Sequence, residues 1–233
     1  MNGAEALVTV LVRSGVELCL ANPGTSEMQL VAAIDKIPGL RPVLALYEGV
    51  VTGAADGYAR LAGKPACTLL HLGPGLANGV ANLHNARKAN SPVINVVGDH
   101  ATYHLGFDAP LTSDIEGIAR PVSRWVKTSS DAASLASDGA QAVAAAGRLP
   151  GGVTTLIVPA DAAWSELPAD YALPPSLPPL APPAVSAAQI KTVAAAIRAA
   201  RNPMLLLGGE ALVGDALRDA GRIAACTGIR LHA

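Results

Sequence analysis

The side chain of Glu48 has the residue type and the neighbours that proton-transfer chemistry requires. It follows an apolar run over residues 43–46, and small residues come after it, from Gly49 through Thr52 to Gly57. Because there is little side-chain bulk around it, a bound heterocycle could approach this carboxyl group closely and exchange a proton with it. The alternative, which the spacing alone favours, is that Glu48 only fills the first turn of a helix, where the helix dipole favours an acidic residue.

Three segments, one of them containing Glu48, have the composition of junctions between a strand and a following helix. They read Asn-Pro-Gly-Thr-Ser-Glu over 22–27, Tyr-Glu-Gly over 47–49 and His-Leu-Gly-Pro-Gly-Leu-Ala-Asn-Gly over 71–79. In an open α/β sheet, ligands bind beyond the carboxyl ends of the strands, where helix N-termini present free N–H groups. We therefore expect the three junctions to meet at one edge of a sheet.

The Gly73-Pro74-Gly75 sequence also allows a different interpretation, a dinucleotide-binding module of the Rossmann type. Its glycines match the start of a GxGxxG motif, and Asp99 stands near the spacing of a ribose-binding acid, but Asn78 replaces the third glycine. A Gly-Pro-Gly sequence is more often only a tight turn.

Histidines give two further candidates. His100 and His104 are four residues apart, so a helix would place both imidazoles on one face as metal ligands. The glycines and the proline of residues 98–110 favour a loop there instead, and we predict no metal site. His71, at a strand end, is on its own more typical of a half-buried, hydrogen-bonded histidine than of a catalyst.

The elements that must position these residues follow an alternation of short apolar runs and longer alanine-rich stretches. The runs are almost continuously apolar, which is typical of parallel strands that helices cover on both faces. We expect strands at 16–20, 42–46, 66–71, 92–97, 122–127 and 153–158, and helices at 3–14, 26–36, 49–62, 76–89, 114–120 and 132–147. The predicted fold class is α/β: a doubly wound, mainly parallel six-stranded sheet with helices on both faces, over residues 1–165.

Residues 159–183 hold eight of the 18 prolines of the chain. Each proline removes a backbone donor and fixes φ, so we expect neither helix nor strand there and assign 166–185 as a Pro-rich linker. Beyond it we expect helices at 186–201 and 214–226 and strands at 204–207 and 229–231. Two such units cannot close a core of their own, so 186–233 is interpreted as the truncated start of a central α/β domain of a longer protein.

The composition excludes several classes of function. With 51% hydrophobic and 15% charged residues the chain is not intrinsically disordered, and a net charge of -1 argues against a nucleic-acid partner. Three cysteines without a CxxC pair predict neither a disulfide framework nor a zinc site, and indicate a cytoplasmic location. No apolar run approaches the roughly 18 residues that span a bilayer, and the start lacks a signal-peptide pattern, so we expect no membrane partner.

Taken together, the three junctions resemble the N-terminal, pyrimidine-binding domain of thiamine diphosphate enzymes of the acetolactate synthase and benzoylformate decarboxylase group. The resemblance covers residues 1–165, and its specific part is the block 48–60, Glu-Gly-Val-Val-Thr-Gly-Ala-Ala-Asp-Gly-Tyr-Ala-Arg. It implies a thiamine diphosphate-dependent 2-oxo acid decarboxylase or carboligase. In that role Glu48 hydrogen-bonds N1′ of the aminopyrimidine of the cofactor and activates it.

The resemblance also implies roles for residues around the cofactor. His71 matches an active-site histidine of benzoylformate decarboxylase-like members and joins Glu48 as a catalytic candidate. Typical acetolactate synthases read Tyr-Pro-Gly-Gly where this chain reads Asn-Pro-Gly-Thr, so a benzoylformate decarboxylase-like lyase is the alternative activity. The cofactor-binding candidates besides Glu48 are Asn22, Pro23, Gly24, Thr25, Gly73, Gly75 and Asn78.

Partners and further cofactors follow from the same resemblance. The family holds Mg2+ and the diphosphate through a Gly-Asp-Gly motif and a downstream Asn in a C-terminal domain, and this sequence contains no Gly-Asp-Gly. In this family the cofactor lies between two subunits, so the resemblance implies a homodimer or homotetramer and a chain that is inactive alone. It also implies a 2-oxo acid as the substrate, and it allows FAD as a further cofactor. A non-catalytic subunit of a split enzyme is the third interpretation.

Overall fold

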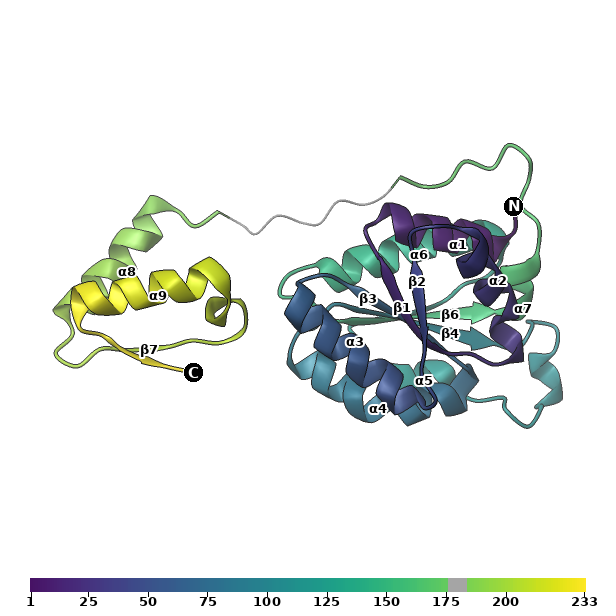
Figure 1. The fold of residues 1–233 in the computed structure, drawn as a ribbon, viewed down its shortest axis with the longest axis horizontal. Helices are drawn as coiled ribbons and strands as arrows, with labels where there is room; N and C mark the ends of the chain where they lie inside the picture. The colour runs from purple at the N-terminus through teal and green to yellow at the C-terminus, as the bar shows by residue number, and fades with distance from the viewer. Residues whose placement is uncertain (176–183) are drawn as a thin grey trace. The chain divides into compact units, whose positions relative to one another are not determined.

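The computed structural model describes residues 1–175 and 184–233, which belong to two units, Met1–Leu180 and Ala181–Ala233 (Figure 1). The middle of the predicted linker, residues 176–183, lies outside the described residues. The assignments of 1–165, 166–185 and 186–233 as domain, linker and truncated domain stay predictions.

The first unit is built on a six-stranded sheet in the order β2-β1-β3-β4-β6-β5, in which every neighbouring pair runs parallel. Four strands, β1, β3, β4 and β6, are buried along almost their whole length, which explains sequences with no alternation of apolar and polar residues. The predicted α/β class with a parallel sheet is confirmed. The strands are β1 (Leu18–Asn22), β2 (Arg41–Leu44), β3 (Ala66–Leu70), β4 (Val93–Asp99), β5 (Trp125–Thr128) and β6 (Val153–Pro159).

Helices cover both faces of this sheet, as a doubly wound fold requires (Figure 1). On one face, Leu7 and Leu135 are fully buried among the side chains of α1 (Gly3–Arg13), α2 (Met28–Lys36), α6 (Ala132–Gly147) and α7 (Ala160–Trp164). On the other, Leu76 and Leu83 are fully buried among those of α3 (Glu48–Ala62), α4 (Leu72–Lys88) and α5 (Ile115–Ala119). The apolar stripe of each helix therefore sets the face that it covers.

The start of α4 corrects the sequence interpretation. The helix was expected at 76–89, after a Gly-Pro-Gly turn, but it begins at Leu72 and takes the three residues into its first turn. Pro74 is tolerated there because the first N–H groups of a helix have no partner within the helix. Leu72 has a φ of 54°, a left-handed conformation that is uncommon for leucine, so the chain turns sharply between β3 and α4.

Two other expectations are wrong in part. A helix, α7, does lie within 159–183: Pro159 is its N-cap, where no backbone donor is needed, and the next proline, Pro168, follows its end. The strand β2 is not covered on both faces. It is the last strand on its side of the sheet, and all four of its residues are exposed.

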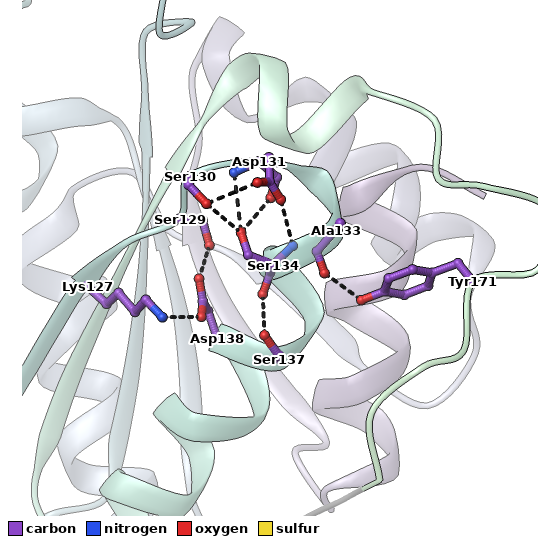
Figure 2. Close-up of polar contacts among 9 residues, drawn as sticks. All are labelled: Lys127, Ser129, Ser130, Asp131, Ala133, Ser134, Ser137, Asp138 and Tyr171. Carbon is purple, nitrogen blue, oxygen red and sulfur yellow. Dashed lines mark hydrogen bonds and ion pairs between the residues drawn. The ribbon is translucent and has the colours of Figure 1, made fainter.

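Side-chain hydrogen bonds fix the start of α6 and the segment that follows α7 (Figure 2). Asp131, the N-cap of α6, accepts a hydrogen bond of 2.8 Å from the N–H of Ser134. One helical turn beyond Ser134, the carboxyl group of Asp138 binds Nζ of Lys127 in β5 at 2.6 Å. The hydroxyl of Tyr171 donates to the carbonyl of Ala133 over 2.6 Å and ties residues beyond α7 to the same helix.

Loss of the α6 cap gives a first prediction. Asp131→Ala is expected to lower the free energy of unfolding by about 1 kcal/mol, because it leaves N–H groups of the first turn without their acceptor. The control is Asp35→Ala at an exposed position of α2, which should change stability by less than about 0.5 kcal/mol. Urea unfolding followed by circular dichroism measures both, and equal losses for the two variants would contradict the capping role.

The second unit is a smaller α/β piece in which β7 (Met204–Leu206) and β8 (Arg230–His232) pair in parallel. The helices α8 (Ala187–Ala199) and α9 (Gly214–Thr227) accompany them, close to the positions expected from sequence. No residue of α8 is buried, and Ala220 is the buried residue of α9. The apolar faces of these helices therefore stay largely uncovered within the unit. In the part of the chain that the structure describes, no helix combines the length and the apolar character needed to cross a membrane.

Candidate functional site

The candidate site lies at the carboxyl edge of the sheet, where β1 and β3 end side by side. Asn22, the last residue of β1, pairs with Leu70, the last residue of β3. From these ends the chain continues into α2 on one face and into α4 on the other. Such a reversal of the winding opens a crevice between the two connections, and this is where open α/β sheets bind ligands.

A buried acid and a histidine join the two connections. Nδ1 of His71, the residue directly after β3, lies 2.8 Å from Oε2 of Glu27. The same oxygen accepts a hydrogen bond of 2.7 Å from the N–H of Gly24. Glu27 is completely enclosed, whereas 24% of the His71 side chain is exposed. The second carboxyl oxygen of Glu27, Oε1, has no hydrogen-bond partner among the described residues.

Two glycines make the space that this pair occupies. A Cβ atom on Gly24 would overlap the imidazole of His71, and a Cβ atom on Gly98 would overlap the carboxyl group of Glu27. Gly98 belongs to β4, so residues at the ends of three neighbouring strands enclose the Glu27 side chain. Neither position accepts a larger residue unless the pair moves.

Glu48 lies on the other side of the first turn of α4. It is half-buried at the first position of α3, and its Oε2 accepts a hydrogen bond of 3.0 Å from Nδ2 of Asn78. A Cβ atom on Gly75 would stand 3.3 Å from Oε1 of Glu48 and 3.5 Å from Cβ of His71. Glu48 and His71 therefore flank the same glycine, whose missing side chain leaves space beside Oε1.

The helices α3 and α4 lie close together next to Glu48. Thr52 donates a hydrogen bond of 3.0 Å to the carbonyl of Gly79, and Asn82 donates one of 2.6 Å to the carbonyl of Gly49. Small residues on both helices allow this approach and leave a shallow groove of about 570 Å³ on the surface. Its lining residues are Tyr47, Gly49, Val50, Gly53, Ala54, Asn78, Ala81 and Asn82.

Five of the residues proposed from sequence meet in this arrangement, and others do not. Gly24, His71, Gly75, Glu48 and Asn78 form one continuous set of neighbours. The remaining candidates lie as follows: Gly73 packs against Ser113 in the segment before α5, Thr25 is exposed and its side chain makes no hydrogen bond within the described residues, and Asn22 and Pro23 are half-buried at the end of β1.

Glu27 is the residue that sequence reasoning missed. The Asn-Pro-Gly-Thr-Ser-Glu segment was assigned as a junction, but no role was given to its last residue. A spacing of three residues between Gly24 and Glu27 is that of a capping box, in which the acid reaches back to a backbone N–H. That signal predicts the hydrogen bond to Gly24 but not the contact with His71, because His71 comes from a distant part of the sequence.

The metal and dinucleotide alternatives gain no support from the geometry. His100 and His104 lie in a turn and not on a helix, with ring centres 5.4 Å apart. Within residues 1–175 and 184–233 no three His, Cys, Asp or Glu side chains gather as metal ligands would. Asp99 is buried, and its carboxyl group accepts a hydrogen bond from the N–H of His100 at the end of β4. Burial raises the pKa of the Asp99 carboxyl.

The enclosure of Glu27 predicts a pH dependence of stability. Burial raises the pKa of the Glu27 carboxyl above its ordinary value of 4.5 and outweighs the lowering by the Gly24 N–H and His71. Between 4.5 and this higher pKa the folded state holds more protons than the unfolded state. The contribution of this group to the free energy of unfolding is therefore largest below pH 4.5 and falls as the pH rises through the folded pKa.

Glu27→Gln removes this titration, so the stability of the variant relative to the wild type should rise as the pH increases from 4.5 through the raised pKa of Glu27. Urea unfolding at several pH values measures the difference. Asp131→Asn is the control of opposite sign, because the N–H of Ser134 lowers the pKa of Asp131 and its stabilisation is lost as the pH falls. A pH-independent difference between the Glu27→Gln variant and the wild type would contradict the account of Glu27.

Comparison with known proteins identifies the family to which the chain belongs. Residues 1–120, slightly more than half of the chain, match the family described as thiamine pyrophosphate enzyme, N-terminal TPP binding domain. The chain belongs to this family, and the resemblance noted in the sequence is confirmed.

Individual members of the family show which proteins the chain is similar to. The chain is 52% identical over 230 residues to the Mycobacterium tuberculosis protein named "Putative acetolactate synthase large subunit IlvX", covering 99% of this chain and 44% of that protein. It is 31% identical over 213 residues to a benzoylformate decarboxylase of Pseudomonas aeruginosa, covering 88% of this chain and 39% of that protein. The solved structure of a thiamine diphosphate-dependent 4-hydroxybenzoylformate decarboxylase of Rhodococcus jostii RHA1 has the same fold, with a TM-score of 0.91 at 24% identity over 99% of this chain and 44% of that one. The chain thus spans less than half the length of these relatives.

Proposed function

We propose that this chain is the pyrimidine-binding part of a thiamine diphosphate-dependent enzyme that decarboxylates a 2-oxo acid and, in the manner of acetolactate synthases, adds the product to an acceptor carbonyl. The single observation that supports this most is the half-buried carboxyl group of Glu48 at the crevice, held by Asn78 and flanked across Gly75 by His71. Membership of the thiamine pyrophosphate enzyme family also supports the proposal.

The residues present fit an aminopyrimidine ring. A heterocycle with a basic nitrogen needs an acidic partner, open space beside it and a polar group that fixes the partner. Oε2 of Glu48 is fixed by Asn78, and the absence of a Cβ atom at Gly75 leaves space beside Oε1. Gly75 therefore presents backbone without side-chain bulk at this edge, whereas the space beside Gly24 is filled by the imidazole of His71.

The positions of Glu48, Asn78 and His71 indicate the role that each would have beside the bound cofactor. When bound, thiamine diphosphate would supply an electron sink for the electron pair that stays on the former carbonyl carbon of the substrate when its carboxylate leaves as carbon dioxide. Glu48 would hold a proton at N1′ of the aminopyrimidine, with Asn78 keeping its carboxyl group in place. His71 would offer a ring nitrogen to the substrate for proton transfer, a type of contribution that is typically worth about 100- to 10,000-fold in rate.

Partners and the remaining cofactors belong to the same proposal. The exposed side chains of Tyr47 and Val50 at the groove between α3 and α4 support a subunit contact beside Glu48, so we propose a homodimer or homotetramer. Mg2+ and the diphosphate would be held by a part of the protein outside this chain, which has no Gly-Asp-Gly. We keep FAD as a further proposed cofactor. A cytoplasmic location is proposed from three cysteines that are all free thiols.

One observation favours a second candidate, a benzoylformate decarboxylase-like lyase. The pairing of His71 with Glu27 provides a proton-transfer group at the crevice, which a lyase needs to protonate its product. The experiment that separates the two is product analysis of the complete protein, supplied with Mg2+ and with pyruvate or benzoylformate. Turnover that requires thiamine diphosphate supports the proposal, and the carbon skeleton of the product distinguishes ligation from simple decarboxylation. Turnover without thiamine diphosphate would contradict both.

A further inference from the structure

We infer that Glu27 is a positioning residue, which holds His71 in the tautomer that has its proton on Nδ1 and leaves Nε2 free at the crevice. The use of Nε2 in catalysis rests on the proposed function, whereas the hydrogen bond between Glu27 and His71 does not depend on it. Glu27 acts only through His71, because its own side chain is fully enclosed.

The hydrogen bonds at Oε2 of Glu27 determine which atom carries the proton. The N–H of Gly24 can only donate, so Oε2 is an acceptor in that bond. At a pH above its pKa, which burial raises, the carboxyl group of Glu27 is ionised. A carboxylate has no proton to give, so the contact of 2.8 Å with His71 requires Nδ1 to be the donor.

The surroundings of the imidazole determine which nitrogen reaches the crevice. A Cβ atom on Gly24 would overlap Nδ1, Cε1 and Cγ of His71, so the backbone of Gly24 closes this side of the ring. The side chain of His71 is still 24% exposed. Its Nε2 makes no hydrogen bond within the described residues and is not among the enclosed polar atoms, so the edge of the ring with Nε2 is open. With Nδ1 protonated, a neutral His71 presents an Nε2 lone pair there and can accept a proton.

The enclosure of Glu27 is costly for a side chain that served packing alone. Its Oε1 has no partner within the described part of the chain, and a buried oxygen without a hydrogen bond typically lowers stability. The fold makes room for the carboxyl group by keeping a glycine at position 98. A methionine would fill similar space without the unpaired oxygen, but it would leave both the Gly24 N–H and Nδ1 of His71 without their acceptor, so the carboxyl group is explained by these two hydrogen bonds.

Nitrogen NMR of the chain with 15N-labelled histidine tests the inference. The 15N shifts distinguish a protonated from an unprotonated ring nitrogen, and the His71→Gln variant identifies which of the five histidines is His71. We compare the wild type with Glu27→Met, which removes the acceptor, and Glu27→Gln, which keeps one. In the Gln variant the Gly24 N–H pins the amide oxygen at the Oε2 position, so Nδ1 of His71 should still donate. Asp138→Asn, at another buried carboxyl group that does not touch His71, is the control for general destabilisation.

We expect Nδ1–H in the wild type, the Gln variant and the control, and a shift to mainly Nε2–H in the Met variant. A wild-type spectrum that shows Nε2–H overturns the inference. If the Glu27→Met variant does not fold, the wild-type spectrum by itself is the test. An unchanged tautomer in a folded Met variant overturns it too. Absence of thiamine diphosphate dependence in the complete protein would overturn the proposed function while leaving these spectra unaffected. Conversely, loss of the pairing would leave cofactor dependence intact.

Discussion

Glu48→Gln is expected to lower the thiamine diphosphate-dependent turnover of the complete protein about 1,000-fold, within the range that general acid–base groups contribute. Glutamine has nearly the shape of glutamate and can keep a hydrogen bond with Asn78, so the local structure should persist. What it loses is the ability to take up and release a proton beside the space at Gly75. Steady-state kinetics at saturating thiamine diphosphate and Mg2+ measures the effect.

The matched control for this prediction is Glu17→Gln. Glu17 precedes β1, at the opposite edge of the sheet, where its carboxylate binds Tyr58 at 2.6 Å and Lys64 at 3.0 Å on the surface. The same chemical change there should leave turnover within about threefold of the wild type, because an exposed ion pair contributes little. Retention of wild-type turnover by the Glu48→Gln variant would contradict the proton-transfer role.

Gly98→Ala is expected to give the largest loss of stability at the site, about 3 kcal/mol. The added Cβ atom would overlap both the carboxyl group and Cγ of Glu27, so the whole side chain has to leave a space in which it is fully enclosed. Overpacking a core typically costs about 1–3 kcal/mol, and breaking the buried hydrogen bond to Gly24 adds about 1–3 kcal/mol. Urea unfolding measures the loss.

Gly57→Ala provides the matched comparison. Gly57 lies in the middle of α3, and a Cβ atom there would meet nothing within 4 Å. The same substitution should therefore stabilise the protein by about 0.5–1 kcal/mol, the usual gain from replacing a helical glycine by alanine. If Gly98→Ala destabilised the protein by less than about 1 kcal/mol, the close packing of Glu27 against β4 would be refuted.

The fold class could be predicted from the sequence because each strand or helix leaves a pattern in its own short stretch of residues. The runs of β3, β4 and β6 are almost continuously apolar, which is typical of covered parallel strands, and each lies within two residues of its predicted place. The exposure of β2 could not be predicted in this way, because an apolar run has the same sequence whether or not neighbours cover it. That property depends on the position of β2 as the last strand on its side.

The site was predictable only where a residue follows a strand. Glu48, His71 and Gly75 were placed at one sheet edge from their junctions, and they do lie together. The pairing of Glu27 with His71 joins residues 44 positions apart, and the space for it is made by Gly98 of a third strand. Such a set follows from the strand order β1-β3-β4, which no local pattern in one sequence specifies.

The measurement that tests the central claim most directly is the rate at which the C2 proton of thiamine diphosphate exchanges with solvent deuterium in the complete protein. This exchange needs no substrate, so it isolates the activation of the cofactor that we assign to Glu48 through N1′ of the aminopyrimidine. We predict exchange that is at least about 100-fold slower in the Glu48→Gln variant than in the wild type and unchanged in the Glu17→Gln control. Equal exchange rates in the wild type and the Glu48→Gln variant, with the cofactor bound to both, would contradict the account.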